Sequence, residues 1–267
     1  MPAPNQITVQ QLQRLIGTPD APTIIDVRID EDFAEIPRLI PGARRQAFNL
    51  IESLASSLAG RRAVVVCHKG KKLSEGAAAL LRTHGVAAEV LQGGAVAWAA
   101  AEAPTLTPNV GPSNSLWVTR HRPKIDRIAC PWLIRRFVDP DARFLFVPPA
   151  EVLDVADRFD AAPFDIEDVF WSHRGEACTF DTMIDEFGLA TDALSKLATI
   201  VRGADTNRHD LAPEAAGLLA ASLGLSRMYR DDLEQLDAGM LLYDAFFRWA
   251  RDAADEGHDW PSNAKGP

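Results

Sequence analysis

The sequence predicts an α/β parallel sheet with flanking helices, followed by a mostly helical α+β second domain. Short apolar runs alternate with helical patterns in the first region, which is typical of buried parallel strands with helices on both faces. A segment rich in Pro, Gly, Ser and Asn then precedes a region of helical periodicity. Domains are therefore expected at residues 1–106 and 115–255, with a linker at 107–114 long enough to separate two cores and a polar tail at 256–267.

The elements of the first region follow from two patterns. Thr8 suits an N-cap, and Val9, Leu12 and Ile16 share one face of a helix over residues 7–16. Apolar runs predict strands at residues 23–28, 63–66 and 88–91, and helical spacing predicts helices at 51–58, 72–84 and 95–101.

The second region carries fewer strand signals. Pro131 fits the first turn of a helix that runs to Phe137, and Thr179 suits an N-cap. The remaining patterns predict strands at residues 116–119, 143–147 and 168–172, and helices at 151–159, 179–187, 193–201, 213–223 and 233–254.

Charge and cysteine usage limit the classes of function. The net charge is −9, so the excess of positive charge needed to neutralise nucleic-acid phosphates is absent, and no nucleic-acid partner is expected. No apolar run approaches the roughly 20 residues of a membrane span. The odd number of cysteines, three, and their wide spacing argue against a disulfide framework. We expect a cytoplasmic protein with reduced thiols and no membrane contact.

The stretch around Cys67 carries the clearest chemical signal. A β-branched run ends at this cysteine, and the basic turn His68, Lys69, Gly70, Lys71 and Lys72 leads into a helix. Free backbone N–H groups at a helix N-terminus and nearby positive charges stabilise a thiolate and hold an anion. The sequence therefore predicts a reactive thiol in an anion-binding loop.

Five segments of the first region together resemble the single-domain rhodanese (sulfurtransferase) family, over about residues 5–105. They are residues 26–28, 40–43, 67–72 and 91–94, and Trp98. The resemblance implies that Cys67 takes sulfur from thiosulfate or another sulfane donor, forms a persulfide and passes the sulfur to a thiol acceptor. Among the matched residues, we expect Asp26 and Arg28 to orient the loop rather than take part in the chemistry.

Two positions depart from the family pattern. Lys72 stands where an arginine is common, and Leu39 stands where many members have a histidine. Lysine keeps the charge but loses the bidentate geometry of arginine. A thiol-based phosphatase is the rival interpretation, but it needs an arginine six residues after the cysteine, where this chain has Leu73.

The second region resembles the chromate-resistance protein family over about residues 115–252. Residues 121–137 and 173–181 carry the resemblance, which implies a link to chromate resistance and no agreed reaction. Its polar residues suggest a site for a zinc-like transition metal, or for chromate or another oxyanion, although no cofactor is certain and the cysteines also suit a core. The candidates are His121, Asp126, Arg127, Cys130, His173, Glu176, Cys178 and Asp205.

Three functions remain open on these observations. The first is a sulfurtransferase that forms a Cys67 persulfide and is coupled to a chromate-resistance-type domain. The second is an oxyanion- or metal-sensing regulatory protein whose first domain is only a redox-responsive or binding module. The third is a scaffold with an inactive first domain, which the cysteine and the basic loop count against.

Overall fold

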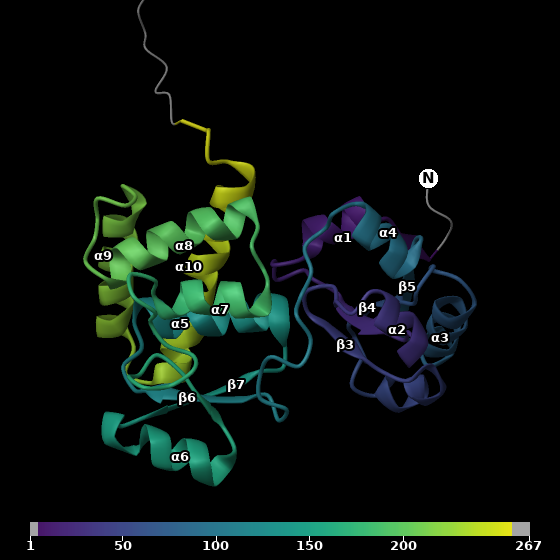
Figure 1. The fold of residues 1–267 in the computed structure, drawn as a ribbon, viewed down its shortest axis with the longest axis horizontal. Helices are drawn as coiled ribbons and strands as arrows, with labels where there is room; N and C mark the ends of the chain where they lie inside the picture. Colours follow the sequence, from purple (N-terminus) through teal and green to yellow (C-terminus); the bar gives the residue numbers. More distant parts are fainter. Residues whose placement is uncertain (1–4, 258–267) are drawn as a thin grey trace, which may run out of the picture.

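The computed structural model describes residues 5–257, and Figure 1 shows two regions side by side. Most of the predicted tail at 256–267 lies outside the described residues. No helix among the residues described is both long enough and apolar enough to cross a membrane.

The first region is a parallel five-stranded sheet in the order β1-β5-β4-β2-β3, which confirms the predicted fold class. Each strand is short and is followed by a helical segment, as expected for crossover connections. The elements are β1 (Gln6–Ile7), α1 (Val9–Leu15), β2 (Thr23–Asp26), α2 (Asp30–Glu35), β3 (Ala43–Arg45), the 3₁₀ helix η1 (Phe48–Leu54), β4 (Arg62–Val66), α3 (Lys72–Thr83), β5 (Ala87–Leu91) and α4 (Gly94–Ala100).

Alternation along β4 divides the first core between the two faces of the sheet. Ala63, Val65 and Cys67 pack in one apolar cluster, with residues of η1 and α3. Val64 and Val66 belong to a second cluster, with residues of α1 and α4. Successive side chains of a strand point to opposite faces, so a fully apolar strand requires cover on both.

The second region joins a small parallel sheet, in the order β7-β6-β8, to a helical bundle. α6 covers one face of β6 through Val118 and Val152, whereas Trp117 faces the helices. The elements are β6 (Leu116–Arg120), α5 (Ile125–Leu133), the π-helical turn η2 (Ile134–Val138), β7 (Arg143–Val147), η3 (Pro149–Glu151), α6 (Val152–Phe159), β8 (Ala162–Pro163), α7 (Thr179–Phe187), α8 (Asp192–Asp205), α9 (Glu214–Met228) and α10 (Asp232–Asp252).

Three local predictions in the second region are wrong. The strand expected at residues 168–172 is a loop in which Trp171 makes a single bridge with Phe164, because the positive φ angles of Asp165 and Asp168 interrupt an extended chain. Pro131 lies inside α5, which begins six residues earlier. Cys178, rather than Thr179, is the N-cap of α7.

One apolar core runs through both regions. The cluster on the α1 and α4 face of the first sheet continues into Phe137 and Phe247 of the second region. The backbone N–H of Gly42 donates to the carbonyl of Phe137 across the two regions at 2.5 Å, and Leu39 and Leu106 exchange backbone hydrogen bonds within the first region. The linker at residues 107–114 was expected to separate two cores. The two regions instead share one core.

Candidate functional sites

Cys67 lies between the end of β4 and the start of α3, at the carboxyl edge of the sheet. It is 5% exposed, and its Sγ accepts the backbone N–H of Lys71 at 3.3 Å. Ser74 Oγ lies 3.1 Å from the same sulfur. The first turn of α3 therefore directs polar groups at the thiol, where they can stabilise negative charge on sulfur. Ser74 was not among the predicted site residues, although its hydroxyl lies in the first helical turn after the loop.

Close backbone packing fixes the Cys67 loop against α4. The N–H of Ala95 donates to the Cys67 carbonyl at 3.0 Å, and that of Val96 donates to the His68 carbonyl at 3.0 Å. Gly94 has φ +61°, and a Cβ there would overlap the Cys67 carbonyl oxygen. Only glycine fits such a position without strain. Gly93 and Gly94 therefore do more than form a turn, since they hold the loop that carries the thiol.

Asp26 and Arg28 form a buried ion pair, with Arg28 Nη2 and Asp26 Oδ2 2.5 Å apart. The Arg28 guanidinium also donates to the carbonyls of Ile36 at 2.7 Å and Arg38 at 2.8 Å. The pair thus ties strand β2 to the segment at residues 36–38, and it does not contact the thiol.

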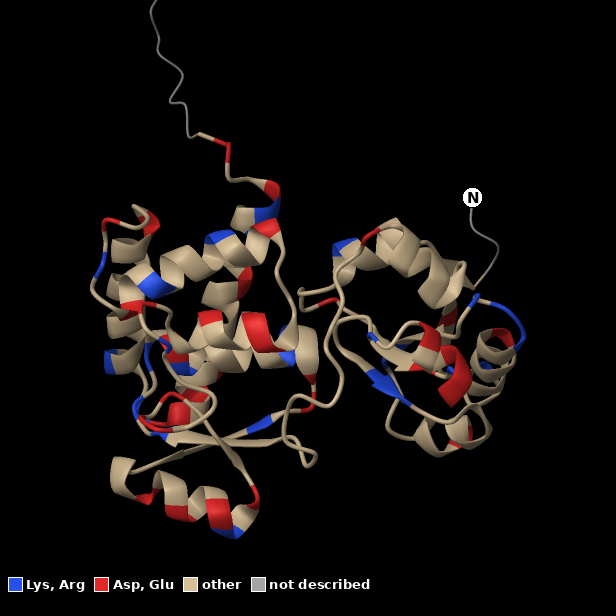
Figure 2. Ribbon diagram, viewed as in Figure 1, with Lys and Arg blue, Asp and Glu red and all other residues tan. Residues whose placement is uncertain are grey.

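The loop that follows Cys67 carries basic side chains on its solvent side. Lys69, Lys71 and Lys72 are exposed, and His68 Nε2 lies 3.1 Å from Glu35 Oε2. Figure 2 shows this loop in blue beside α3. An arriving anion would therefore meet positive charge at the mouth of the loop and N–H donors at its base.

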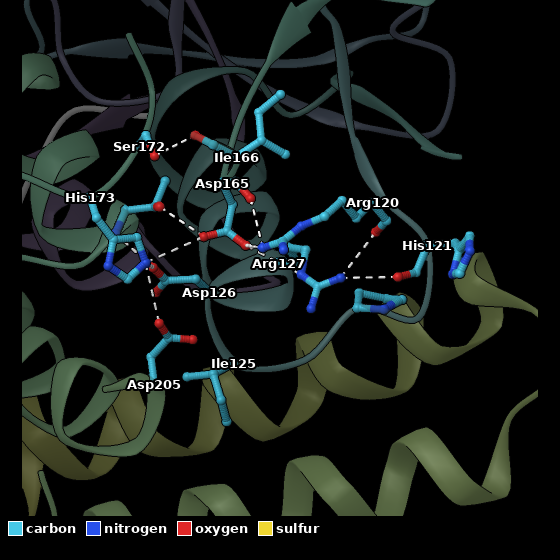
Figure 3. Close-up of polar contacts among 12 residues, drawn as sticks. Arg120, His121, Ile125, Asp126, Arg127, Asp165, Ile166, Ser172, His173 and Asp205 are labelled. Atoms are coloured by element: carbon cyan, nitrogen blue, oxygen red, sulfur yellow. Dashed lines mark hydrogen bonds and ion pairs between the residues drawn. The ribbon is translucent and has the colours of Figure 1, made fainter. Parts of the chain in front are cut away.

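A second polar site lies in the C-terminal region (Figure 3). Nε2 of His173 is 3.5 Å from Asp126 Oδ2, 3.5 Å from Asp165 Oδ1 and 3.3 Å from Asp205 Oδ2. Asp126 is in the first turn of α5, Asp205 ends α8, and Asp165 and His173 lie in the loop between β8 and α7. Elements far apart in sequence thus bring three carboxylates to one imidazole.

Burial and charge perturb this cluster strongly. Burial raises the pKa of Asp126 well above its ordinary value, and the nearby charges of Asp205 and Asp165 raise it further. Hydrogen bonding to Asp165 and Asp205 raises the pKa of His173 to about 10, despite the opposing effect of burial. Burial would raise the pKa of Asp165, but its contacts with His173 and Arg127 outweigh burial and lower it.

Two arginines pair with Asp165. Arg120 Nη2 lies 3.2 Å from Asp165 Oδ2, and Arg127 Nε lies 3.3 Å from the same oxygen. Thr179 Oγ1 donates to Asp165 Oδ1 at 2.9 Å. Asp165 is therefore well partnered. Asp165 was not among the predicted candidates, because it follows a strand of only two residues that includes Pro163 and gives no clear pattern in the sequence.

The other predicted candidates are not among the ligand atoms that converge with His173, although the Cys178 thiol lies close enough to Asp126 to lower the pKa of that carboxyl slightly against the effect of burial. Cys130 and Cys178 are fully buried, and burial raises the pKa of both thiols well above the ordinary value. They lie in the apolar core, because α5 is buried along nearly its whole length and α7 packs against it. Glu176 is 90% exposed and pairs with Arg208 at 3.5 Å, and His121 is exposed.

Comparison with known proteins assigns a family to each region. Residues 8–101 match the rhodanese-like domain family, and residues 117–250, half of the chain, match the family described as ChrB, C-terminal domain. Protein ChrB of Cupriavidus metallidurans is 35% identical over 128 residues, which are 47% of this chain and 38% of that protein. The chain therefore matches little more than a third of the length of this relative.

The solved structures that resemble this chain include several that cover about a third of it. A crystal structure from Staphylococcus saprophyticus subsp. saprophyticus is 28% identical and covers 34% of this chain and 88% of its own, with a TM-score of 0.30. A rhodanese-like domain protein from Staphylococcus aureus is 27% identical and covers 35% and 90% respectively, with a TM-score of 0.32. By its family matches, the chain belongs to the ChrB C-terminal domain family and carries a rhodanese-like domain ahead of that domain.

Proposed function

We propose that the protein is a sulfurtransferase that forms a persulfide on Cys67. The observation that carries the proposal is the polar setting of the sulfur, which accepts the Lys71 N–H at 3.3 Å and lies 3.1 Å from Ser74 Oγ. A thiolate there gains stabilisation from the N-terminus of α3. The rhodanese-like match over residues 8–101 supports the same reaction class.

The reaction has two balanced steps. The Cys67 thiolate attacks the outer sulfur of thiosulfate, an S–S bond forms to Cys67, and the S–S bond of thiosulfate breaks as sulfite leaves with the electron pair. A nucleophile such as cyanide or a thiolate then attacks the outer sulfur of the persulfide, and Cys67 leaves as the thiolate. Exposed Lys69, Lys71 and Lys72 favour the approach of the anionic donor.

Steady-state transfer of sulfur from thiosulfate to cyanide tests the proposal. Cys67→Ser should abolish turnover, because a hydroxyl cannot store sulfane sulfur. Cys178→Ser is the matched control, since Cys178 is buried at the N-cap of α7, where serine is a favoured residue. Turnover that persists in Cys67→Ser, or that is lost only in Cys178→Ser, would contradict the proposal.

We further infer that the C-terminal domain couples sulfur transfer to chromate resistance. The supporting observation is the match of residues 117–250 to the ChrB C-terminal domain family, together with the core that the two regions share. Chromate tolerance of cells that produce the wild-type chain should exceed that of cells that produce Cys67→Ser. Equal tolerance would show that the C-terminal domain acts without sulfur transfer.

A further inference from the structure

Nε2 of His173 lies near more hydrogen-bond acceptors than it can donate to. It lies within 3.5 Å of oxygens from Asp126, Asp165 and Asp205. A ring nitrogen carries at most one hydrogen, so it cannot donate a well-aligned bond to all three. Ligand atoms from Asp126, His173 and Asp205 all lie within 4.8 Å of one another. These three side chains converge on one point (Figure 3).

The distances from His173 Nε2 to the Asp126 and Asp205 oxygens match those between ligands of one metal ion. Nitrogen and oxygen ligands about 2.1 Å from a tetrahedral zinc ion lie about 3.4 Å from each other. His173 Nε2 is 3.5 Å from Asp126 Oδ2 and 3.3 Å from Asp205 Oδ2. Two of the three ligand pairs thus already have the spacing of ligands on one ion, and the Asp126 and Asp205 oxygens lie within 4.8 Å of each other.

Asp126 gives an independent indication of a cation. It is 1% exposed, and its Oδ2 accepts the backbone N–H of Thr179 at 2.6 Å and faces His173. Its Oδ1 is buried and has no hydrogen-bond partner within the described part of the chain. A buried carboxylate with an unsatisfied oxygen is costly unless a proton or a cation compensates it.

Of the three carboxylates near His173, one is neutralised by arginines and two are available to bind such an ion. Asp165 is paired with Arg120 and Arg127 and accepts a hydrogen bond from Thr179. Asp126 and Asp205 have no arginine or lysine within ion-pair distance among residues 5–257 and share only the imidazole.

We propose that His173 Nε2 and one carboxylate oxygen each of Asp126 and Asp205 bind a divalent first-row transition metal ion. One imidazole and two carboxylates form a set of borderline and hard ligands, which suits Zn²⁺ or Mn²⁺. The thiols of Cys130 and Cys178 are outside the set, which disfavours Cu(I). The site does not involve Cys67 and stands or falls independently of sulfur transfer.

Calorimetric titration of the full chain tests the site. The protein is made without a histidine tag, treated with a chelator and titrated separately with Zn²⁺ and Mn²⁺. The expected result is one ion bound per chain for at least one metal. His173→Ala and Asp205→Asn should each weaken binding at least about tenfold, since even loss of an outer-shell partner costs 10–100-fold.

Two variants serve as matched controls. His121→Ala removes an exposed imidazole of the same domain, and Glu176→Gln removes the charge of a 90% exposed carboxylate. Both should bind like the wild type. Absence of stoichiometric binding for both metals would overturn the proposal, as would affinity unchanged in Asp205→Asn or lost in His121→Ala. Asp205 is 22% exposed at the end of α8, so we expect Asp205→Asn to fold. The comparison of Asp205→Asn with the wild type therefore still tests the site if His173→Ala does not fold.

Discussion

Gly17 brings the backbone of the first region against the aromatic core of the second. It is buried with φ +76°, and a Cβ built there would overlap Phe137 Cζ and lie 2.8 Å from Phe247 Cε1. The two rings pack edge to face with centroids 5.4 Å apart, so neither can move without disturbing the other. Gly17→Ala therefore tests whether the two regions are joined by packing.

The expected cost of Gly17→Ala has two parts. A non-glycine residue in the left-handed region costs about 1–2 kcal/mol. Overpacking of a filled core costs about 1–3 kcal/mol. The free energy of unfolding should therefore fall by about 2–5 kcal/mol. Gly60→Ala isolates the first part, because Gly60 has φ +74° and open space around its Cβ position.

Denaturant unfolding followed by circular dichroism measures both variants. The loss in Gly17→Ala should exceed that in Gly60→Ala by about 1–3 kcal/mol, the part that the two phenylalanines contribute. Equal losses would show that Phe137 and Phe247 do not pack on Gly17 in solution, and the shared core would then be refuted.

Three further predictions concern the loop, the second core and the first region. Replacing Lys69 and Lys72 with alanine should raise KM for thiosulfate more than it lowers kcat, because exposed charge acts on capture of the anion; unchanged KM at all ionic strengths would contradict this. Asp244→Ala should destabilise the chain by about 3 kcal/mol in thermal unfolding, because it leaves the partly buried Arg136 guanidinium unpaired; a loss below about 1 kcal/mol would contradict it. Residues 1–106 alone should transfer sulfur but melt below the full chain, because truncation exposes the shared core; an equal melting temperature would contradict the second part.

Local patterns were sufficient to predict the three central strands of the first region, but they did not predict β1, α2 or β3, and the helix expected at 51–58 is the 3₁₀ helix η1. The β-branched run before Cys67 and the turn at Gly70 both agree with a buried strand that ends at a helix N-terminus. Parallel order then places the cysteine at the carboxyl edge of the sheet. The isolated bridge between Leu39 and Leu106 and the approach of Gly17 to Phe137 could not be predicted, because these contacts join distant segments without a local signal.

The second region was harder to predict because its site combines the ends of two helices, which carry Asp126 and Asp205, with a loop that carries Asp165 and His173. Asp126, His173 and Asp205 were among the candidates, but composition alone could not separate them from Cys130 and Cys178, which lie in the core. The apolar and aromatic run at residues 168–172 indicated a strand, yet Phe170 is 57% exposed there. Loop conformation and burial, rather than residue type, decide which polar groups meet.

Mass spectrometry of the protein after incubation with thiosulfate tests the central claim most directly. The account predicts that one sulfur atom is added, that peptide mapping places it on Cys67, and that cyanide removes it. Cys67→Ser should gain no sulfur under the same conditions. Addition of sulfur to the fully buried Cys130 or Cys178, or no addition to the wild-type chain, would contradict the account.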